Sequence, residues 1–189
     1  NKIVSKKIFK KLSSDEGSPD GMTLDKNKNL WVAHFHGACI SVFNKKAKLI
    51  HRIQFPAKNI TNCAFGGKNN KIISKKIFKK LTPEEGVPDG MTLDKKKNLW
   101  VAHFRGACVS VFNNKAKLIH RIKFPAKNIT NCAFGGKNNK ELYVSTATKG
   151  MNKADLRKFR YSGFFFCVKT NAKGFLQKKF ILNNEEKRS

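Results

Sequence analysis

The sequence predicts an all-β protein, an incomplete β-propeller built from four-stranded antiparallel blades. Short apolar runs alternate with turn-rich segments at intervals of roughly ten residues, which suits an antiparallel sandwich, a barrel or a propeller. Leu30–Phe35 is apolar on both faces, whereas residues 49–55 alternate between apolar and polar side chains. Inner strands covered on both faces and a half-exposed outer strand are the pattern of a propeller blade.

A segment of 69 residues occurs twice, almost letter for letter. Residues 2–70 and 71–139 differ at ten positions, most of them mild exchanges such as Ile40 for Val109. A fixed period of this size indicates a repeat architecture. The near-identity indicates a recent segmental duplication, so that every site in the unit is present twice and the second copy can be redundant.

Each copy contains the strands of one blade. In the first copy we expect strands at residues 22–24, 30–35, 39–43 and 49–55, separated by the turn segments 25–29, 36–37 and 44–48. The same pattern recurs in the second copy. We therefore expect two good blades, over about residues 20–58 and 89–127.

The chain between these blades is expected to hold a truncated blade. A strand at residues 59–65 is followed almost at once by residues 71–78, which read as an outer strand. After the second copy, strands at 141–147, 163–169 and 175–180 complete a C-terminal blade over about residues 128–182. The whole chain, residues 1–189, then forms a single partial propeller whose open sheet edges predict marginal stability or self-association.

The net charge of +28, from 40 basic and 12 acidic residues, has two interpretations. One is a surface for nucleic acid, anionic membrane or another polyanion. The other is compositional, because Lys, Asn, Ile and Phe run high together. The lysines are spread through turn-like segments, with no run of five basic residues and no RNA-binding aromatic signature. The compositional interpretation is favoured, and we expect no specific nucleic-acid partner.

Neither a membrane span nor a disulfide framework is predicted. The longest apolar run, residues 163–168, is far too short to cross a bilayer, and the first residues contain no signal-peptide apolar region. The five cysteines lie in apolar strand-like runs without a C-x-x-C pair. We expect a cytoplasmic protein with buried, reduced thiols and no membrane partner.

Five motifs occur in a fixed order along the chain. They are Pro19-Asp-Gly-Met22, Leu30-Trp-Val-Ala33, Ile60-Thr-Asn-Cys-Ala-Phe-Gly-Gly67, Glu141-Leu-Tyr-Val-Ser-Thr-Ala147 and Ser162-Gly-Phe-Phe-Phe166, and the first three recur from Pro88, Leu99 and Ile129. Together they resemble the senescence marker protein/regucalcin/gluconolactonase family of six-bladed propellers. The resemblance covers nearly all of the chain, but only the C-terminal half of the family pattern, partly doubled. It implies a fragment of a six-bladed fold.

The resemblance implies a metal-dependent hydrolase of sugar lactones, a carboxylic ester hydrolase. In that family a divalent metal, usually calcium or zinc, lies at one end of the central channel. One ligand is the Asp of a P-D-G motif, which can also act as general base. These positions are Asp20 and Asp89, with Asp89 the first choice because the blade after it is intact. The residues alone predict a carboxylate on a rigid loop before the innermost strand, with a plain turn Asp as the alternative.

This sequence departs from the family pattern at the remaining metal ligands. The resemblance places these on a Glu and on Asn residues of earlier blades, and no G-E-x-P or S-N-G segment supplies them. We therefore expect an incomplete or impaired copy of the enzyme. Two alternatives stay open, namely a non-catalytic basic module that binds polyanions and an inactive product of the duplication.

His34 and His36 form an H-x-H pattern, which can be a metal pair. The second copy keeps His103 but has Arg105 in place of the other histidine. Buried or turn histidines are the favoured interpretation.

Overall fold

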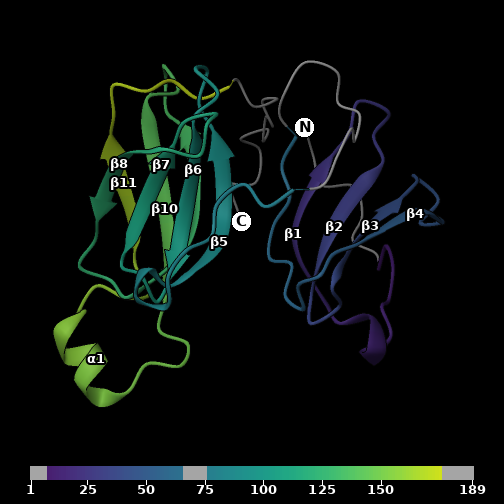
Figure 1. Cartoon of the computed structure of the whole chain (residues 1–189), viewed down its shortest axis with the longest axis horizontal. Helices are drawn as coiled ribbons and strands as arrows, with labels where there is room; N and C mark the ends of the chain where they lie inside the picture. The colour runs from purple at the N-terminus through teal and green to yellow at the C-terminus, as the bar shows by residue number, and fades with distance from the viewer. Residues whose placement is uncertain (1–7, 66–75, 176–189) are drawn as a thin grey trace, which may run out of the picture.

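The computed structural model describes residues 8–65 and 76–175 as three antiparallel β-sheets, with one short α-helix (Figure 1). The first sheet has the order β1 (Ser18–Leu24), β2 (Leu30–Phe35), β3 (Cys39–Phe43) and β4 (Leu49–Gln54). The second has the order β5 (Val87–Leu93), β6 (Leu99–Phe104), β7 (Cys108–Phe112) and β8 (Leu118–Lys123). The third pairs β9 (Asn128–Gly135), β10 (Glu141–Ala147) and β11 (Phe165–Lys169), with β10 in the centre. The predicted all-β class is confirmed.

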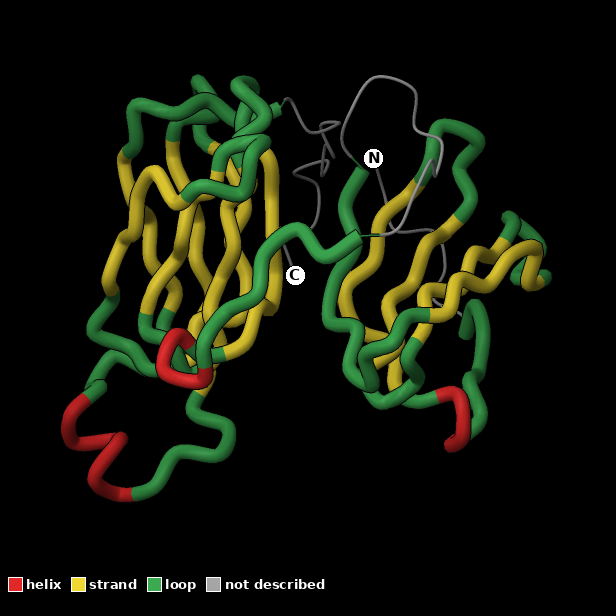
Figure 2. Tube along the Cα trace, viewed as in Figure 1, coloured by secondary structure: helices red, strands yellow, loops and turns green. Residues whose placement is uncertain are grey.

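Short helical elements lie at one end of the sheets. The 3-10 helices Ser14–Glu16 and Pro83–Glu85 precede β1 and β5, and α1 (Lys153–Lys158) lies between β10 and β11. Figure 2 shows them at the end opposite the first hairpin turn of the second sheet. None of the described helices is long and apolar enough to cross a membrane.

An aspartate anchors the first turn of each four-stranded sheet. The Asp94 carboxylate accepts hydrogen bonds from Asn98 N, Asn98 Nδ2 and Trp100 Nε1 at 2.9, 2.8 and 3.1 Å. Asp25 makes the same three contacts with Asn29 and Trp31 in the first copy. Because these bonds satisfy the carboxylate and fix the indole, the D-x-x-x-N-L-W segment forms the same hairpin in both copies.

The core lies between the second and third sheets. Its largest fully buried apolar side chains include Val109, Val111, Ile129, Leu142 and Val144. Trp100 meets Phe134 edge to face, with ring centroids 5.1 Å apart, an arrangement that adds to the burial energy. This packing determines how β9 lies against β5 and β6.

The two copies of the repeat differ in how they are covered. Trp100 is 5% exposed, whereas its counterpart Trp31 is only half-buried and contacts Phe65 at 5.0 Å. Leu24 is 58% exposed, while Leu93 is partly buried. The reason is that strands equivalent to β10 and β11 do not follow the first copy.

The strand predicted at residues 59–65 is wrong. These residues pack on the first sheet but form no strand, although the same letters at 128–135 form β9. In the second copy β10 pairs along β9 from Glu141 to Ala147, and no described strand does this for residues 59–65. A strand without a partner leaves its backbone groups unpaired, so the sequence pattern alone does not produce one.

Several predicted boundaries also differ from the structure. β1 begins four residues before the predicted strand, because its first residues already pair with the end of β2. β11 begins at Phe165. Of the predicted strand at 71–78 only residues 76–78 are described, and they are not in a strand; of the one at 175–180 only Phe175 is described.

The thiols were predicted to be buried, and this is right for Cys39, Cys108 and Cys132. Cys63 is half-buried, and Cys167 is exposed, contrary to the prediction. Cys167 lies on the face of β11 opposite Val168, so the alternation of the strand turns it away from the core.

Candidate functional site

The P-D-G motifs lie inside strands, at β-bulges. Pro19 pairs with His34 and Met22 with Val32, so two residues of β1 oppose a single residue of β2. Pro88 and Met91 show the same shift in β5. A bulge of this kind re-aims a side chain and is frequent beside active sites. The predicted loop before the innermost strand is thus wrong, because Asp20 and Asp89 lie within β1 and β5.

Glycine is required after each aspartate by close packing. A Cβ on Gly90 would clash with the side chain and Cα of Asn131, and one on Gly21 would clash with Asn62 and the carbonyl of Thr61. Gly21 N donates to Thr61 O at 2.7 Å. The segment after each sheet, which contains Asn62 in the first copy and Asn131 in the second, therefore packs tightly against the bulge beside the aspartate.

The two aspartates lie close enough to influence each other. Burial and, to a lesser degree, the charge of Asp20 raise the pKa of Asp89 to about 6, and the hydrogen bond from the Gly90 N–H acts in the opposite direction. Burial also raises the pKa of Asp20, while the N–H of Gly21 and the charge of Lys149 act against it. A shared location of two acidic groups with raised pKa values is typical of functional sites.

A cleft of about 740 Å³ lies beside these groups, within the range of small-molecule sites. Asp20 lines it directly, and Asp89 lies next to it without forming its wall. Met22 and Met91 of the two innermost strands, with Asn62 and Asn131, supply other parts of its wall. The structure therefore brings both predicted site residues to one place.

The described residues contain no cluster of three His, Cys, Asp or Glu side chains able to hold a metal ion. His34 is fully buried, with Nδ1 2.7 Å from Glu16 O, while His36 lies in a turn and meets the Phe35 ring edge to face. The H-x-H pair is thus a buried and a turn histidine, as favoured above. The two carboxylates are oxygen ligands, the kind that calcium prefers, and Cys63 and Cys132 also line the neighbouring cleft.

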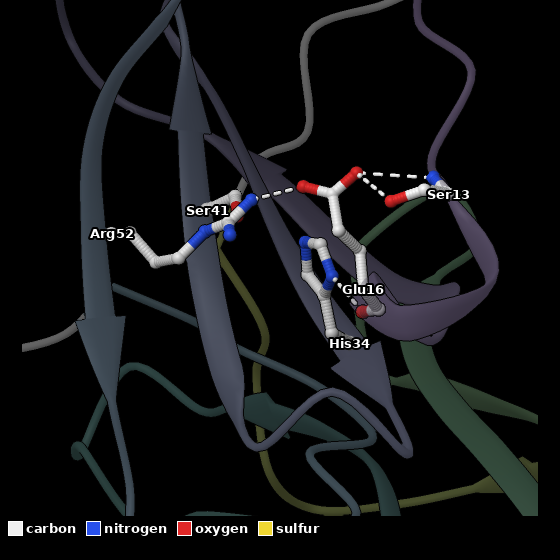
Figure 3. A network of polar contacts seen from close by, with 5 residues as sticks. All are labelled: Ser13, Glu16, His34, Ser41 and Arg52. Carbon is white, nitrogen blue, oxygen red and sulfur yellow. Dashed lines mark hydrogen bonds and ion pairs between the residues drawn. The ribbon is translucent and has the colours of Figure 1, made fainter.

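A polar network that the sequence reasoning missed supports the end of each four-stranded sheet. In Figure 3, Glu16 bonds to Ser13 N and Oγ at 3.1 Å each and reaches Arg52, which also donates to Ser41 Oγ at 3.1 Å. The contacts from Ser13 and Arg52 lower the pKa of Glu16 to about 2. Glu85 and Arg121 repeat the pair in the second copy. The partners lie 36 residues apart, so no local motif reveals them.

One protein-family profile matches two segments of the chain. Residues 1–73 and 68–148 each match the sequence profile of the SMP-30/gluconolactonase/LRE-like region. The chain belongs to this family. The predicted resemblance is confirmed, and the double match follows the internal repeat.

The relatives match more than half of this chain, but the match covers less than half of each relative. A Bacillus subtilis protein, provisionally named a sugar lactone lactonase, is 30% identical over 134 residues, which are 70% of this chain and 46% of that protein. Regucalcin from Danio rerio is 38% identical over 104 residues, 54% of this chain and 34% of its own. The chain thus spans less than half the length of these relatives.

A solved structure supports the architecture. A calcium-binding protein, regucalcin, from Agrobacterium tumefaciens superposes with a TM-score of 0.55 at 17% identity, over 87% of this chain and 50% of that one. At this identity the likeness concerns the fold alone. Together with the three sheets, it confirms the prediction of a partial β-propeller.

Proposed function

We propose that this chain is a sugar-lactone hydrolase of the gluconolactonase lineage, with its reaction centre at Asp20 and Asp89. The observation that carries the proposal is the proximity of these two carboxylates, each at a β-bulge, beside a cleft of about 740 Å³ that Asp20 lines. The family membership and the relatives support the same reaction class.

In the proposed reaction a water molecule attacks the lactone carbonyl. Asp89 accepts a proton from that water, a carbon–oxygen bond forms, and the ring ester bond breaks. The ring oxygen takes up a proton, which gives the open hydroxy acid. A carboxylate with a raised pKa is a stronger base than an ordinary one and is still ionised at neutral pH, which suits Asp89 for this role.

Asp20 has the second role in this proposal. It lines the cleft, and its charge opposes ionisation of Asp89, so it helps to keep that group basic. In this proposal Asp20 also orients the substrate, because an ionised carboxylate readily accepts hydrogen bonds from sugar hydroxyls.

The donor set at this place fits calcium in part. Two carboxylates that repel each other would be relieved by a hard cation, and Asp20 and Asp89 would hold it, with the other ligands drawn from water or from other parts of the protein. When bound, such an ion polarises the lactone carbonyl. We expect calcium over zinc, because both groups proposed to hold the ion are carboxylate oxygen donors.

The test is a lactonase assay on the purified chain, with spontaneous hydrolysis of gluconolactone subtracted. We expect Asp89→Asn to lower kcat/KM about 100-fold, the scale of general-base catalysis, and Asp20→Asn to lower it less. After treatment with EDTA, calcium should restore activity better than zinc.

Asp15→Asn is the control, because Asp15 is exposed on the first 3-10 helix, away from the cleft. Equal rates for the parent chain, both single variants and the double variant would exclude a catalytic role for either aspartate. A parent chain inactive with every cation would favour the inactive duplication product. Steeply salt-dependent retention on heparin, with no hydrolysis, would favour the polyanion-binding module.

A further inference from the structure

A second cleft lies at the end of the molecule opposite the aspartates. Asp89 is near the start of β5, and the turn 94–98 follows the end of that strand. Figure 2 shows this turn and the loop after β11 at the end of the sheets away from α1. The cleft has a volume of about 650 Å³ and lies between the second and third sheets, so it is separate from the proposed reaction centre.

Four lysines line this cleft, and the backbone holds their segments together. Lys95 and Lys96 come from the turn after β5, and Lys169 and Lys173 come from β11 and the loop after it. Lys95 N donates to Lys173 O at 2.7 Å, and Asp94 forms a β-bridge with Gly174. Lys169 lies on the face of β11 away from Val168 and pairs with Glu141 of β10, so the charge of the rim comes from Lys95, Lys96 and Lys173.

The rim has no free acidic partner among the described residues. Asp94, the acidic residue of the cleft, is buried and accepts bonds from Asn98 and Trp100. The ion pairs that the described chain makes join Arg52 to Glu16, Arg121 to Glu85 and Lys127 to Asp155, all outside this cleft. The cleft thus presents uncompensated positive charge.

The floor and one wall are aliphatic. Val111 lies between Trp100 and His120 across three neighbouring strands and is only 1% exposed, so the floor that a ligand can contact is the partly buried Ile122, the next residue on the same face. Val168 of β11 forms the opposing wall. The Trp100 ring is 5% exposed and already packs on Phe134, which leaves no open aromatic face for stacking a nucleobase.

We propose that this cleft binds a small amphiphilic anion, with an aliphatic body on the branched side chains and a carboxylate or phosphate head at Lys95, Lys96 and Lys173. Aliphatic contact supplies the burial energy, and the lysines supply attraction to the charged end. A purely polar anion would leave the aliphatic side chains of the cleft exposed to water, and an uncharged alkane would leave the lysine ammonium groups without a counter-charge.

The first copy of the repeat is a built-in control. It carries the same row, Trp31, Val42 and His51, and the same turn with Lys26 at the position of Lys95. It lacks the wall that β11 provides, because no described strand pairs beside residues 59–65. Only the second copy therefore has a complete site.

The experiment is a calorimetric titration of the whole chain with decanoate and with decyl phosphate, each below its micelle concentration. Decanol has the aliphatic chain without the charge, and acetate has the charged carboxylate without the long chain, so the two measure each contribution separately. We expect both anionic amphiphiles to bind at least tenfold more tightly than decanol or acetate, with affinity falling as salt rises. The stronger of the two identifies the preferred head group.

Lys95→Glu should weaken decanoate binding about tenfold, whereas Lys26→Glu, the same change in the first copy, should leave it within twofold. Asp20→Asn and Asp89→Asn should also leave it unchanged, so this result is independent of the lactonase test. The proposal is overturned if Lys26→Glu weakens binding as much as Lys95→Glu, since attraction would then be unspecific. It is equally overturned if decanol binds as tightly as decanoate.

Discussion

At the scale of single residues, Asp89 shows how a common turn motif acquires an unusual chemistry. P-D-G triplets are frequent in ordinary turns. Here partial burial and a second carboxylate raise the pKa of Asp89 from its ordinary value of 3.8 to about 6. Because the second carboxylate comes from the duplicated motif, the repeat itself creates the electrostatic pair.

The raised pKa predicts a specific dependence of stability on pH. The folded protein holds a proton on Asp89 more tightly than the unfolded chain, so stability falls as pH rises from 3.8 through about 6. Asp89→Asn should remove this loss. The shift is reduced by solvent screening because Asp89 is only half-buried, so we expect a gain on the order of 1 kcal/mol at pH 7 and none at pH 3.

Thermal unfolding in EDTA at the two pH values measures the effect. Asp15→Asn, at an exposed position, should change neither melting temperature. An Asp89→Asn variant that is no more stable than the parent at neutral pH would contradict the electrostatic account.

At the scale of elements, the bulge in β5 depends on the strand that packs behind it. Gly90→Ala places a methyl group against Asn131, and overpacking of this kind costs about 1–3 kcal/mol. We expect a lower melting temperature by several degrees, since 1 kcal/mol corresponds to roughly 2–4 °C at this chain length.

Two variants make this prediction specific. Adding Asn131→Ala should not rescue Gly90→Ala, because the Asn131 Cα lies 2.6 Å from the new methyl position. Gly135→Ala should cost less, because its methyl meets the exposed and movable ring of Tyr143. Full rescue by Asn131→Ala would show that the side chain, not the backbone, sets the constraint.

The predicted strands were most accurate where a hairpin closes locally. The strands at 30–35 and 39–43 have the predicted bounds, because Asp25 fixes the turn before β2 and the apolar runs pair with immediate neighbours. The bulges were missed, because pairing between Pro19 and His34 depends on the distant end of β2. The ion pairs of Glu16 and Glu85 were missed for the same reason.

At the scale of the whole molecule, the two copies show how packing against other strands affects the stability of nearly identical sheets. Among the described strands, β9 packs against β5, β6 and β7 of the second sheet, and the first sheet has no such cover from them. We therefore expect amides of β3 to exchange with solvent faster than those of β7, although the two strands differ only at Ile40 and Val109. Hydrogen exchange followed by mass spectrometry can distinguish the peptides 36–45 and 105–114, which differ in mass. Equal protection would mean that β9–β11 add no stability to the second sheet.

The open face of the third sheet predicts self-association. Phe165 is 83% exposed and lies beside Cys167 and Tyr143 on the face away from the core. An apolar patch of this kind favours contact with another copy. Phe165→Lys should shift the monomer–oligomer midpoint at least tenfold towards monomer, since burying a phenylalanine contributes about 1.5–3 kcal/mol.

Sedimentation velocity over a range of concentrations measures this shift. Ile77→Lys is the matched control, because Ile77 has the same exposed fraction and lies outside the third sheet. A parent chain that stays monomeric at all concentrations would refute the prediction.

The sequence by itself determined the all-β class, the repeat and the hairpins, because these depend on alternation, turn chemistry and motifs within a few residues. The choice of Asp20 and Asp89 came from the resemblance to the family and stays a prediction. Tertiary structure alone decided that residues 128–135 form a strand while the equivalent residues 59–65 do not, since a strand needs a partner for its backbone hydrogen bonds. It also decided that the two aspartates lie near each other, with Asp20 in the wall of a cleft, and that lysines far apart in the chain lie at one rim. Both depend on contacts between sheets, which local patterns do not encode.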